Sequence, residues 1–242
     1  MTFQAYHRSR RMGLALASLR AGEDCTAVAY DHSYESLSGF RDAFKRTFGA
    51  TPGRSDAVQC IHTGRLETPI GPMVAGATDD GICLLEFADR RALQTETAFL
   101  RERLAGAFLP GRHRHLDRLR EELGEYFDGQ RRAFSVPLIT PGTFFQQTVW
   151  ENLRRIPFGQ TLSYSRLAKQ IGRPGAQRAV GRANGDNRIA ILIPCHRVVK
   201  DDGTLCGYGG GVWRKRFLLD LESRAVQSFA PARQGQLFGV AS

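Results

Sequence analysis

Apolar positions in the first fifty residues recur every three or four residues, the spacing of amphipathic helices. The pattern predicts a helix over residues 3–19, ended by Ala21-Gly22, and a short second helix over residues 25–30. A turn at His32-Ser33 leads into a third helix. The apolar stripe of this third helix is Leu37, Phe40, Phe44 and Phe48, and the glycine and proline that end it are Gly49 and Pro52.

Beyond Val58 the apolar alternation shortens to the period of a strand. The predicted strands are residues 61–66, 73–77, 82–87 and 134–138. The predicted helices in this part are residues 93–107 and 116–127. Together these elements predict a small α/β unit in the middle of the chain.

After Pro141 the helical period returns. Apolar residues at helical spacing predict a helix over residues 145–156, and Ser163 is the expected N-cap of a helix that runs to Ile171. A further helix is expected to open at Gly175. The apolar run at residues 189–193 then predicts a buried strand, which Pro194 interrupts.

Composition limits the partners of the chain. Its 242 residues are 42% apolar and carry a formal net charge of +10, which favours a polyanionic partner, with nucleic acid as the first candidate. A basic surface without a binding role is the alternative. Five cysteines without close pairing argue against a disulfide framework or a zinc knuckle and for a reducing compartment. No signal core or membrane-spanning stretch is present, so we predict a soluble, cytoplasmic protein without membrane contact.

The most informative segment is Pro194-Cys195-His196-Arg197-Val198. A thiol held at the end of a buried strand, next to a possible base, suits nucleophilic attack. Two other interpretations remain for this cysteine, namely a metal ligand and a packing residue. Because no partner ligands lie at suitable spacing, a metal site is the weaker alternative.

Several motifs around this segment, in the same order, resemble O6-alkylguanine-DNA alkyltransferases. Besides Gly185-Asp186-Asn187 and residues 191–199, they are Phe145-Gln146-Gln147-Thr148-Val149-Trp150, Ile156-Pro157-Phe158-Gly159, Ser163-Tyr164, Leu167-Ala168, Arg178-Ala179-Val180-Gly181 and Gly203-Thr204-Leu205. The resemblance covers most of residues 142–222. It implies a ribonuclease-H-like α/β subdomain followed by a mainly helical, winged-helix-like catalytic domain.

The N-terminal helices resemble the second half of an AraC-type DNA-binding domain. The matching elements are Arg10-Arg11-Met12, Ser33-Tyr34-Glu35-Ser36 and Phe44-Lys45-Arg46-Thr47-Phe48-Gly49-Ala50-Thr51-Pro52. In that interpretation Arg41 and Lys45 project from the recognition helix toward DNA. A plain three-helix packing unit is the alternative.

The whole chain then resembles the C-terminal part of an Ada-type adaptive-response regulator. We expect an α/β (α+β) protein divided into a helix-turn-helix module (1–55), an α/β subdomain (56–140), a catalytic and DNA-binding domain (141–226) and a flexible tail (227–242). The cysteine-rich zinc module and first helix-turn-helix of such regulators are missing, so we expect neither zinc binding nor phosphotriester repair.

Transfer of an alkyl group to protein needs a soft nucleophile and a proton for the leaving base. The resemblance implies that Cys195 is the nucleophile and His196 its base, with Glu222 on the last helix orienting the histidine. Asn187 would bridge the segment by hydrogen bonds, and Tyr164 would protonate the leaving base. A thioether is a stable product, so we expect a single-turnover transferase without a metal or cofactor.

The target base is inaccessible in stacked DNA and has to be flipped out. The resemblance implies that Arg178 fills the vacated space, while Ala179 allows close approach to the minor groove and Arg182 reaches phosphates. Tyr208 would form a wall of the base pocket. Relatives often carry a polar residue near position 209, where this chain has Gly209, and a roomier pocket is one hypothesis.

The expected partner is double-stranded DNA carrying O6-alkylguanine, and also O4-alkylthymine, bound by a monomer. Promoter DNA is a second expected partner, through residues 1–55. Three alternatives remain: a cysteine hydrolase, a lesion binder without transfer, and a transcription regulator whose alkyltransferase half serves as the sensor. The presence of Cys195 argues against the lesion binder, and the absence of an oxyanion element argues against the hydrolase.

Overall fold

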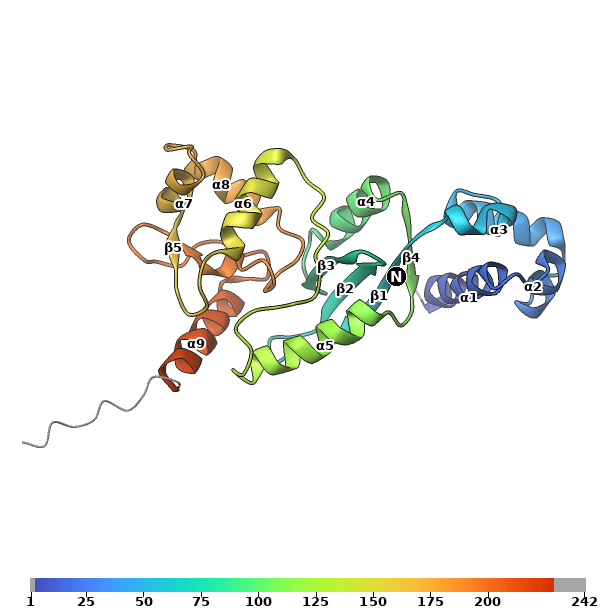
Figure 1. Ribbon diagram of the computed structural model, residues 1–242, viewed down its shortest axis with the longest axis horizontal. Helices are drawn as coiled ribbons and strands as arrows, with labels where there is room; N and C mark the ends of the chain where they lie inside the picture. The colour runs from blue at the N-terminus through green and yellow to red at the C-terminus, as the bar shows by residue number, and fades with distance from the viewer. Residues whose placement is uncertain (1–2, 229–242) are drawn as a thin grey trace, which may run out of the picture.

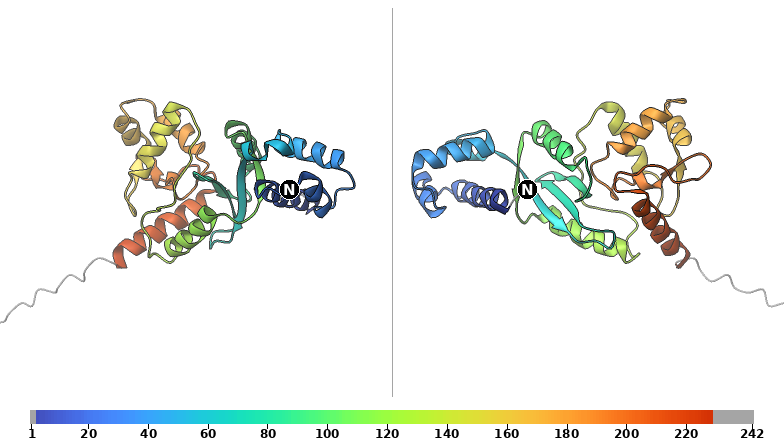
Figure 2. Two further views of the ribbon diagram at one scale, coloured as in Figure 1. Left: turned by 45° about the vertical axis from the view of Figure 1, so that its right-hand side comes forward. Right: turned by 180° about the vertical axis from the view of Figure 1, so that it is seen from behind.

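The computed structural model describes residues 3–228, without the side chains of residues 3, 5 and 6. The N-terminal helices lie at one end of the molecule, a sheet with two covering helices lies in the middle, and a mainly helical part forms the other end (Figure 1). The same order is seen from the other sides (Figure 2). The α/β class is therefore confirmed. Most of the tail predicted from residue 227 lies outside the described residues.

Three helices form the N-terminal end, as the sequence predicts. They are α1 (Phe3–Arg20), α2 (Cys25–Asp31) and α3 (Leu37–Phe48), followed by the 3-10 helix η1 (Pro52–Ala57). Side-chain caps start α2 and α3. Asp24 accepts hydrogen bonds from the backbone N–H groups of residues 26 and 27, and Ser36 accepts one from the N–H of residue 39. Gly49 ends α3 in the left-handed conformation at φ 70°.

The apolar sides of these helices meet in one small core. Its fully buried members include Met12, Val28, Phe40 and Phe44, and Leu109 of the sheet joins them. The N-terminal helices therefore pack on the sheet rather than forming a separate body.

The sheet consists of four strands in the order β3-β2-β1-β4. These are β1 (Gln59–Leu66), β2 (Met73–Thr78), β3 (Gly81–Phe87) and β4 (Gly106–Pro110). The first three form an antiparallel meander, and β4 pairs parallel to β1. The helices α4 (Leu93–Arg103) and α5 (Arg114–Phe127) pack on the sheet.

Two sequence predictions in this part are wrong. The helix expected over residues 93–107 ends at Arg103, because Ala105 takes a left-handed conformation at φ 47° and the chain turns into β4. The strand expected over residues 134–138 is irregular. It touches the sheet through the carbonyl of Pro137, which accepts from Ile82 N–H, and through one bridge at Leu138.

Within residues 141–228 the chain forms four α-helices and a two-stranded sheet. The helices are α6 (Phe144–Arg154), α7 (Tyr164–Gln170), α8 (Gln177–Gly185) and α9 (Val212–Ser228), and the strands are β5 (Leu162–Ser163) and β6 (Val198–Val199). Ser163 caps α7 as predicted, by accepting from Arg166 N–H. A Thr143–Gln146 capping box starts α6.

The strand predicted over residues 189–193 is also wrong. The run is wound into turns, with Ile191 at φ 71°, and only Ile189 bridges to Leu85 of β3. It leads into the 3-10 turn η2 (Cys195–Arg197). The run is apolar because it is buried on all sides, and burial of that kind has no strand-specific period.

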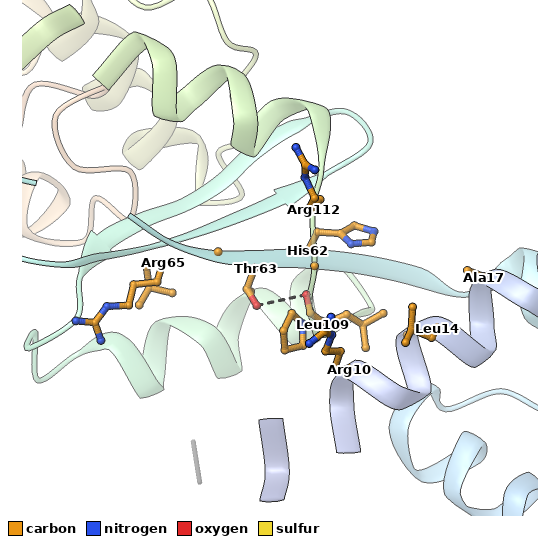
Figure 3. A pocket seen from close by; sticks show the side chains of 13 residues that line it. Arg10, Leu14, Ala17, His62, Thr63, Arg65, Leu109 and Arg112 are labelled. Carbon is orange, nitrogen blue, oxygen red and sulfur yellow. Dashed lines mark hydrogen bonds between the residues drawn. The ribbon is translucent and has the colours of Figure 1, made fainter. Parts of the chain in front are cut away.

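A basic groove of about 790 Å³ is lined by α1 and by strands β1, β2 and β4 (Figure 3). Arg10, Arg65 and Arg112 lie around it, and Leu14 and Leu109 are among its apolar lining residues. None of the predicted site residues lines this groove. No helix within residues 3–228 is long and apolar enough to cross a membrane.

Candidate active site

Cys195 begins the η2 turn, and only 6% of its surface is exposed. Its N–H donates to Ile193 O over 2.8 Å, and Arg197 N–H donates to Pro194 O over 3.0 Å. The thiol is thus held by a tight, buried turn, not by the end of a strand.

Asn187 fixes this turn from the loop after α8. Its side chain is buried and donates from Nδ2 to Ile193 O over 2.9 Å, while its Oδ1 accepts from Ile189 N–H over 3.0 Å. The same Nδ2 lies 3.2 Å from Cys195 Sγ. One amide therefore shapes the backbone and contacts the thiol, which fits the bridging position that the resemblance implied.

His196 and Glu222 are both completely buried, and His196 Nε2 lies 2.8 Å from Glu222 Oε1. Burial lowers the pKa of His196 more strongly than the neighbouring carboxylate raises it. The imidazole is accordingly neutral at pH 7, with Nε2–H donating to Glu222. Its Nδ1 is buried and has no hydrogen-bond partner within residues 3–228, so it is free to accept a proton.

Glu222 also binds groups that sequence reasoning missed. Arg197 donates from Nε and Nη2 over 3.0 and 2.9 Å, Tyr126 Oη donates over 2.8 Å, and Gly159 N–H donates over 3.0 Å. Burial raises the pKa of the carboxyl, but its hydrogen bonds and charge interactions with His196 and Arg197 outweigh this and lower it to about 2. Arg197 follows the histidine in the motif, but no local pattern identified Tyr126.

The environment keeps the thiol protonated at rest. Burial raises the pKa of Cys195 to about 11, and the hydrogen bond from Asn187 and the charges of Arg90 and Lys215 offset only part of that effect. Lys215 is a buried lysine that sequence reasoning also missed, and its Nζ donates to the carbonyls of Val198 and Cys206. Ionisation of the thiol therefore needs a proton acceptor during the reaction.

A small cavity of about 40 Å³ lies beside the thiol. The cavity is lined by Tyr164 and by the loop 207–210, which includes Tyr208. Glu86 of β3 and Arg90 of the loop after β3 also line it. Tyr164 Oη lies 3.5 Å from Cys206 Sγ, and burial raises the pKa of the phenol well above its usual value. Tyr208 packs edge-on against Phe87 with its hydroxyl buried.

The predicted DNA-contacting residues fall into two separate groups. Arg178, Ala179 and Arg182 are exposed on α8, which packs its buried face on α6 and sets Gly181 against the ring of Tyr164. Arg41 and Lys45 are exposed on α3, at the opposite end of the molecule (Figure 1). Within residues 3–228 no group of three His, Cys, Asp or Glu side chains is placed to hold a metal ion.

The substitution Glu222→Gln should lower the free energy of unfolding at pH 7 by about 3–5 kcal/mol, because it leaves the buried Arg197 without its counter-charge. The folded pKa of Glu222 lies below the ordinary value near 4.5, so its stabilisation is present above that pH and is lost as pH falls toward 2. The gap between wild type and variant should therefore narrow at pH 3 in urea titrations.

Glu151→Gln is the matched control, since this carboxylate is exposed on α6, and it should change stability by less than about 0.5 kcal/mol. Equal urea midpoints for wild type and Glu222→Gln at pH 7 would contradict the role given to the carboxylate.

The chain matches two protein-family models and several proteins of known function. A family model described as 6-O-methylguanine DNA methyltransferase, DNA binding domain, matches residues 144–224, and a helix-turn-helix domain model matches residues 1–56. A methylated-DNA–protein-cysteine methyltransferase of Mycobacterium tuberculosis is 42% identical over 172 residues, covering 71% of this chain and 96% of the relative. One from Shigella flexneri is 54% identical over 102 residues, covering 42% of this chain and 60% of the relative.

Solved structures agree. The crystal structure of Mycobacterium tuberculosis OGT in complex with DNA matches at TM-score 0.59 and 41% identity, covering 68% of this chain and 94% of that one. The O6-methylguanine-DNA methyltransferase of Pyrococcus kodakaraensis matches at TM-score 0.50 and 26% identity, covering 67% and 98%. Because the chain is 42% identical to the Mycobacterium tuberculosis methyltransferase over 96% of that protein's length, it belongs to the methylated-DNA–protein-cysteine methyltransferase family.

Proposed function

We propose that this protein repairs DNA by moving the alkyl group of O6-alkylguanine directly onto Cys195. One observation carries the proposal: a buried thiol contacts Asn187 and is followed by a histidine whose orientation a buried carboxylate fixes, in a chain of this family. O4-alkylthymine presents the same kind of alkyl–oxygen bond and is the second expected substrate.

The arrangement of the site indicates which groups release and accept protons during the transfer. Glu222 holds His196 with Nε2–H toward the carboxylate, which leaves Nδ1 as the acceptor for the thiol proton, directly or through one water. The sulfur then attacks the alkyl carbon, a carbon–sulfur bond forms, and the carbon–oxygen bond breaks toward the base. Tyr164, whose high pKa keeps it protonated, donates a proton to the leaving guanine, and the proton taken up by His196 then restores the phenol. Overall, one proton passes from the thiol to the guanine.

Each molecule should act once. The product is a thioether, and the stable carbon–sulfur bond does not hydrolyse at neutral pH. Because a thiol, His196 and a carboxylate offer no route that cleaves it, we expect one alkyl group transferred per protein chain.

The buried thiol supports base flipping. A carbon inside stacked DNA cannot reach the thiol of a residue that is only 6% exposed, so the nucleotide would have to leave the helix. We assign to Arg178 the filling of the gap and to Arg182 the binding of phosphates; the exposure of both side chains on α8 supports these roles. The cavity of about 40 Å³ holds about three waters rather than a purine, so part of its wall would have to move when a base binds.

Intact mass measurement tests the transfer. Incubation with duplex DNA containing O6-methylguanine should add about 14 Da per chain, mapped to Cys195, and the gain should stop at one group even with excess DNA. Cys195→Ser should bind the duplex and gain nothing. An unchanged mass for the wild type, or a group mapped to another residue, would refute the proposal.

A second function is favoured by the N-terminal helices. The capped pair α2–α3 and the helix-turn-helix match over residues 1–56 support sequence-specific binding to promoter DNA, with the alkyltransferase half as the sensor of damage.

Selection from a random duplex pool tests this regulator function, with the protein used before and after methylation of Cys195. We expect an enriched sequence motif, and Arg41→Ala and Lys45→Ala should each weaken its binding by about 1–3 kcal/mol while leaving methyl transfer on short duplexes unchanged. Failure of both protein forms to enrich any motif would leave repair as the sole function.

A further inference from the structure

The loop that walls the thiol cavity rests directly on Arg90, which follows β3. A Cβ atom added to Gly209 would lie 2.5 Å from Arg90 Nη1 and 3.1 Å from Nε, and one added to Gly210 would lie 2.4 Å from the ring of Phe87. The glycine run therefore does not leave a roomy pocket. It lets the guanidinium of Arg90 approach the backbone where any larger residue would collide with it.

Arg90 is a fixed part of the cavity wall. Its side chain is 11% exposed. Nη1 donates to Glu86 Oε2 and, over 3.3 Å, to Asn187 O. Nη2 donates to Gly185 O over 2.7 Å and pairs with Glu96 Oε1 at 3.0 Å. The side chain thus joins the sheet and α4 to the loop that carries Asn187.

A guanidinium has five N–H donors. On Arg90 three of those on the terminal nitrogens make hydrogen bonds, to Glu86, Asn187 O and Gly185 O, and Nη2 also forms an ion pair with Glu96. The Nε–H makes no hydrogen bond within residues 3–228, and Nε is not fully buried. Arg90 and Cys195 line the same cavity. A charged residue with an unpaired N–H donor therefore lines the cavity beside the thiol.

The surrounding charges support a role beyond packing. Glu86 is completely buried in the same wall, and burial raises its pKa to about 7, partly offset by Arg90. The positive charge of Arg90 also favours the thiolate of Cys195, whereas Glu86 opposes it. Arg90 thus screens the reacting sulfur from a carboxyl group within the cavity wall.

Resting on the proposed function, we propose that Arg90 is a substrate-positioning residue, whose Nε–H donates a hydrogen bond to O6 of the flipped alkylguanine. The bond strengthens as the carbon–oxygen bond breaks and negative charge grows on O6. No new covalent step is involved. Held by two carboxylates and two carbonyls, the donor is already oriented before the base enters.

Single-turnover transfer rates on two substrates test this role. On O6-methylguanine duplexes Arg90→Ala should slow transfer about 100-fold, the usual loss for one donor to a developing oxyanion. On duplexes with S6-methylthioguanine the atom facing Arg90 is sulfur, a weak acceptor, so the same substitution should cost only about threefold. A residue that merely supported the fold would slow both substrates equally.

Arg91→Ala is the matched control, because it removes the adjacent arginine, which is exposed and does not line the cavity, and it should change either rate less than about threefold. If Arg90→Ala proves unstable, Arg90→Lys keeps the charge without the Nε geometry and should show the same contrast between substrates. Equal losses on both substrates, or wild-type rates on both, would overturn the proposal. Failure of the wild type to transfer at all would instead refute the proposed function.

Discussion

The buried carboxylate of Glu222 is the constraint on which the C-terminal part of the molecule depends. An isolated ionised carboxylate is too costly to bury, so every lone pair must find a donor. The donors come from α5, from the turn after α6 and from the η2 turn, and they fix α9 against all three. The position of His196 is thus set by the hydrogen bonds that the buried carboxylate of Glu222 requires.

That constraint also sets the resting state of the thiol. With its proton on Nε2, His196 is neutral and offers no positive charge to stabilise a thiolate, and burial keeps Cys195 protonated. Such a thiol reacts poorly with solvent electrophiles, which suits a nucleophile that is consumed by one reaction. Under the proposed function, its reactivity would depend on the base entering the cavity, with His196 as the proton acceptor and Arg90 in the cavity wall.

Asn187 and His196 could be located from sequence because they lie within eight residues of Cys195 in one motif, and their roles stay predictions. Glu222 required the resemblance, since a carboxylate on a helix has no local signal of burial. Residues 189–193 were misassigned because a fully buried turn and a buried strand share the same apolar composition. Strand β4 was not predicted, because the helix-forming residues before it extended the predicted helix into the start of the strand. Arg90 could not be found, because its contacts with Asn187 and Gly209 join segments about one hundred residues apart.

The ionisation state of Cys195 tests this account most directly. Ultraviolet absorbance of the thiolate near 240 nm, recorded against pH for the protein without DNA and for Cys195→Ser, isolates this cysteine by difference. We expect a protonated thiol throughout the neutral range, with titration near pH 11. Titration at or below pH 7 would mean a preformed thiolate and would contradict a proton transfer to His196 during the reaction.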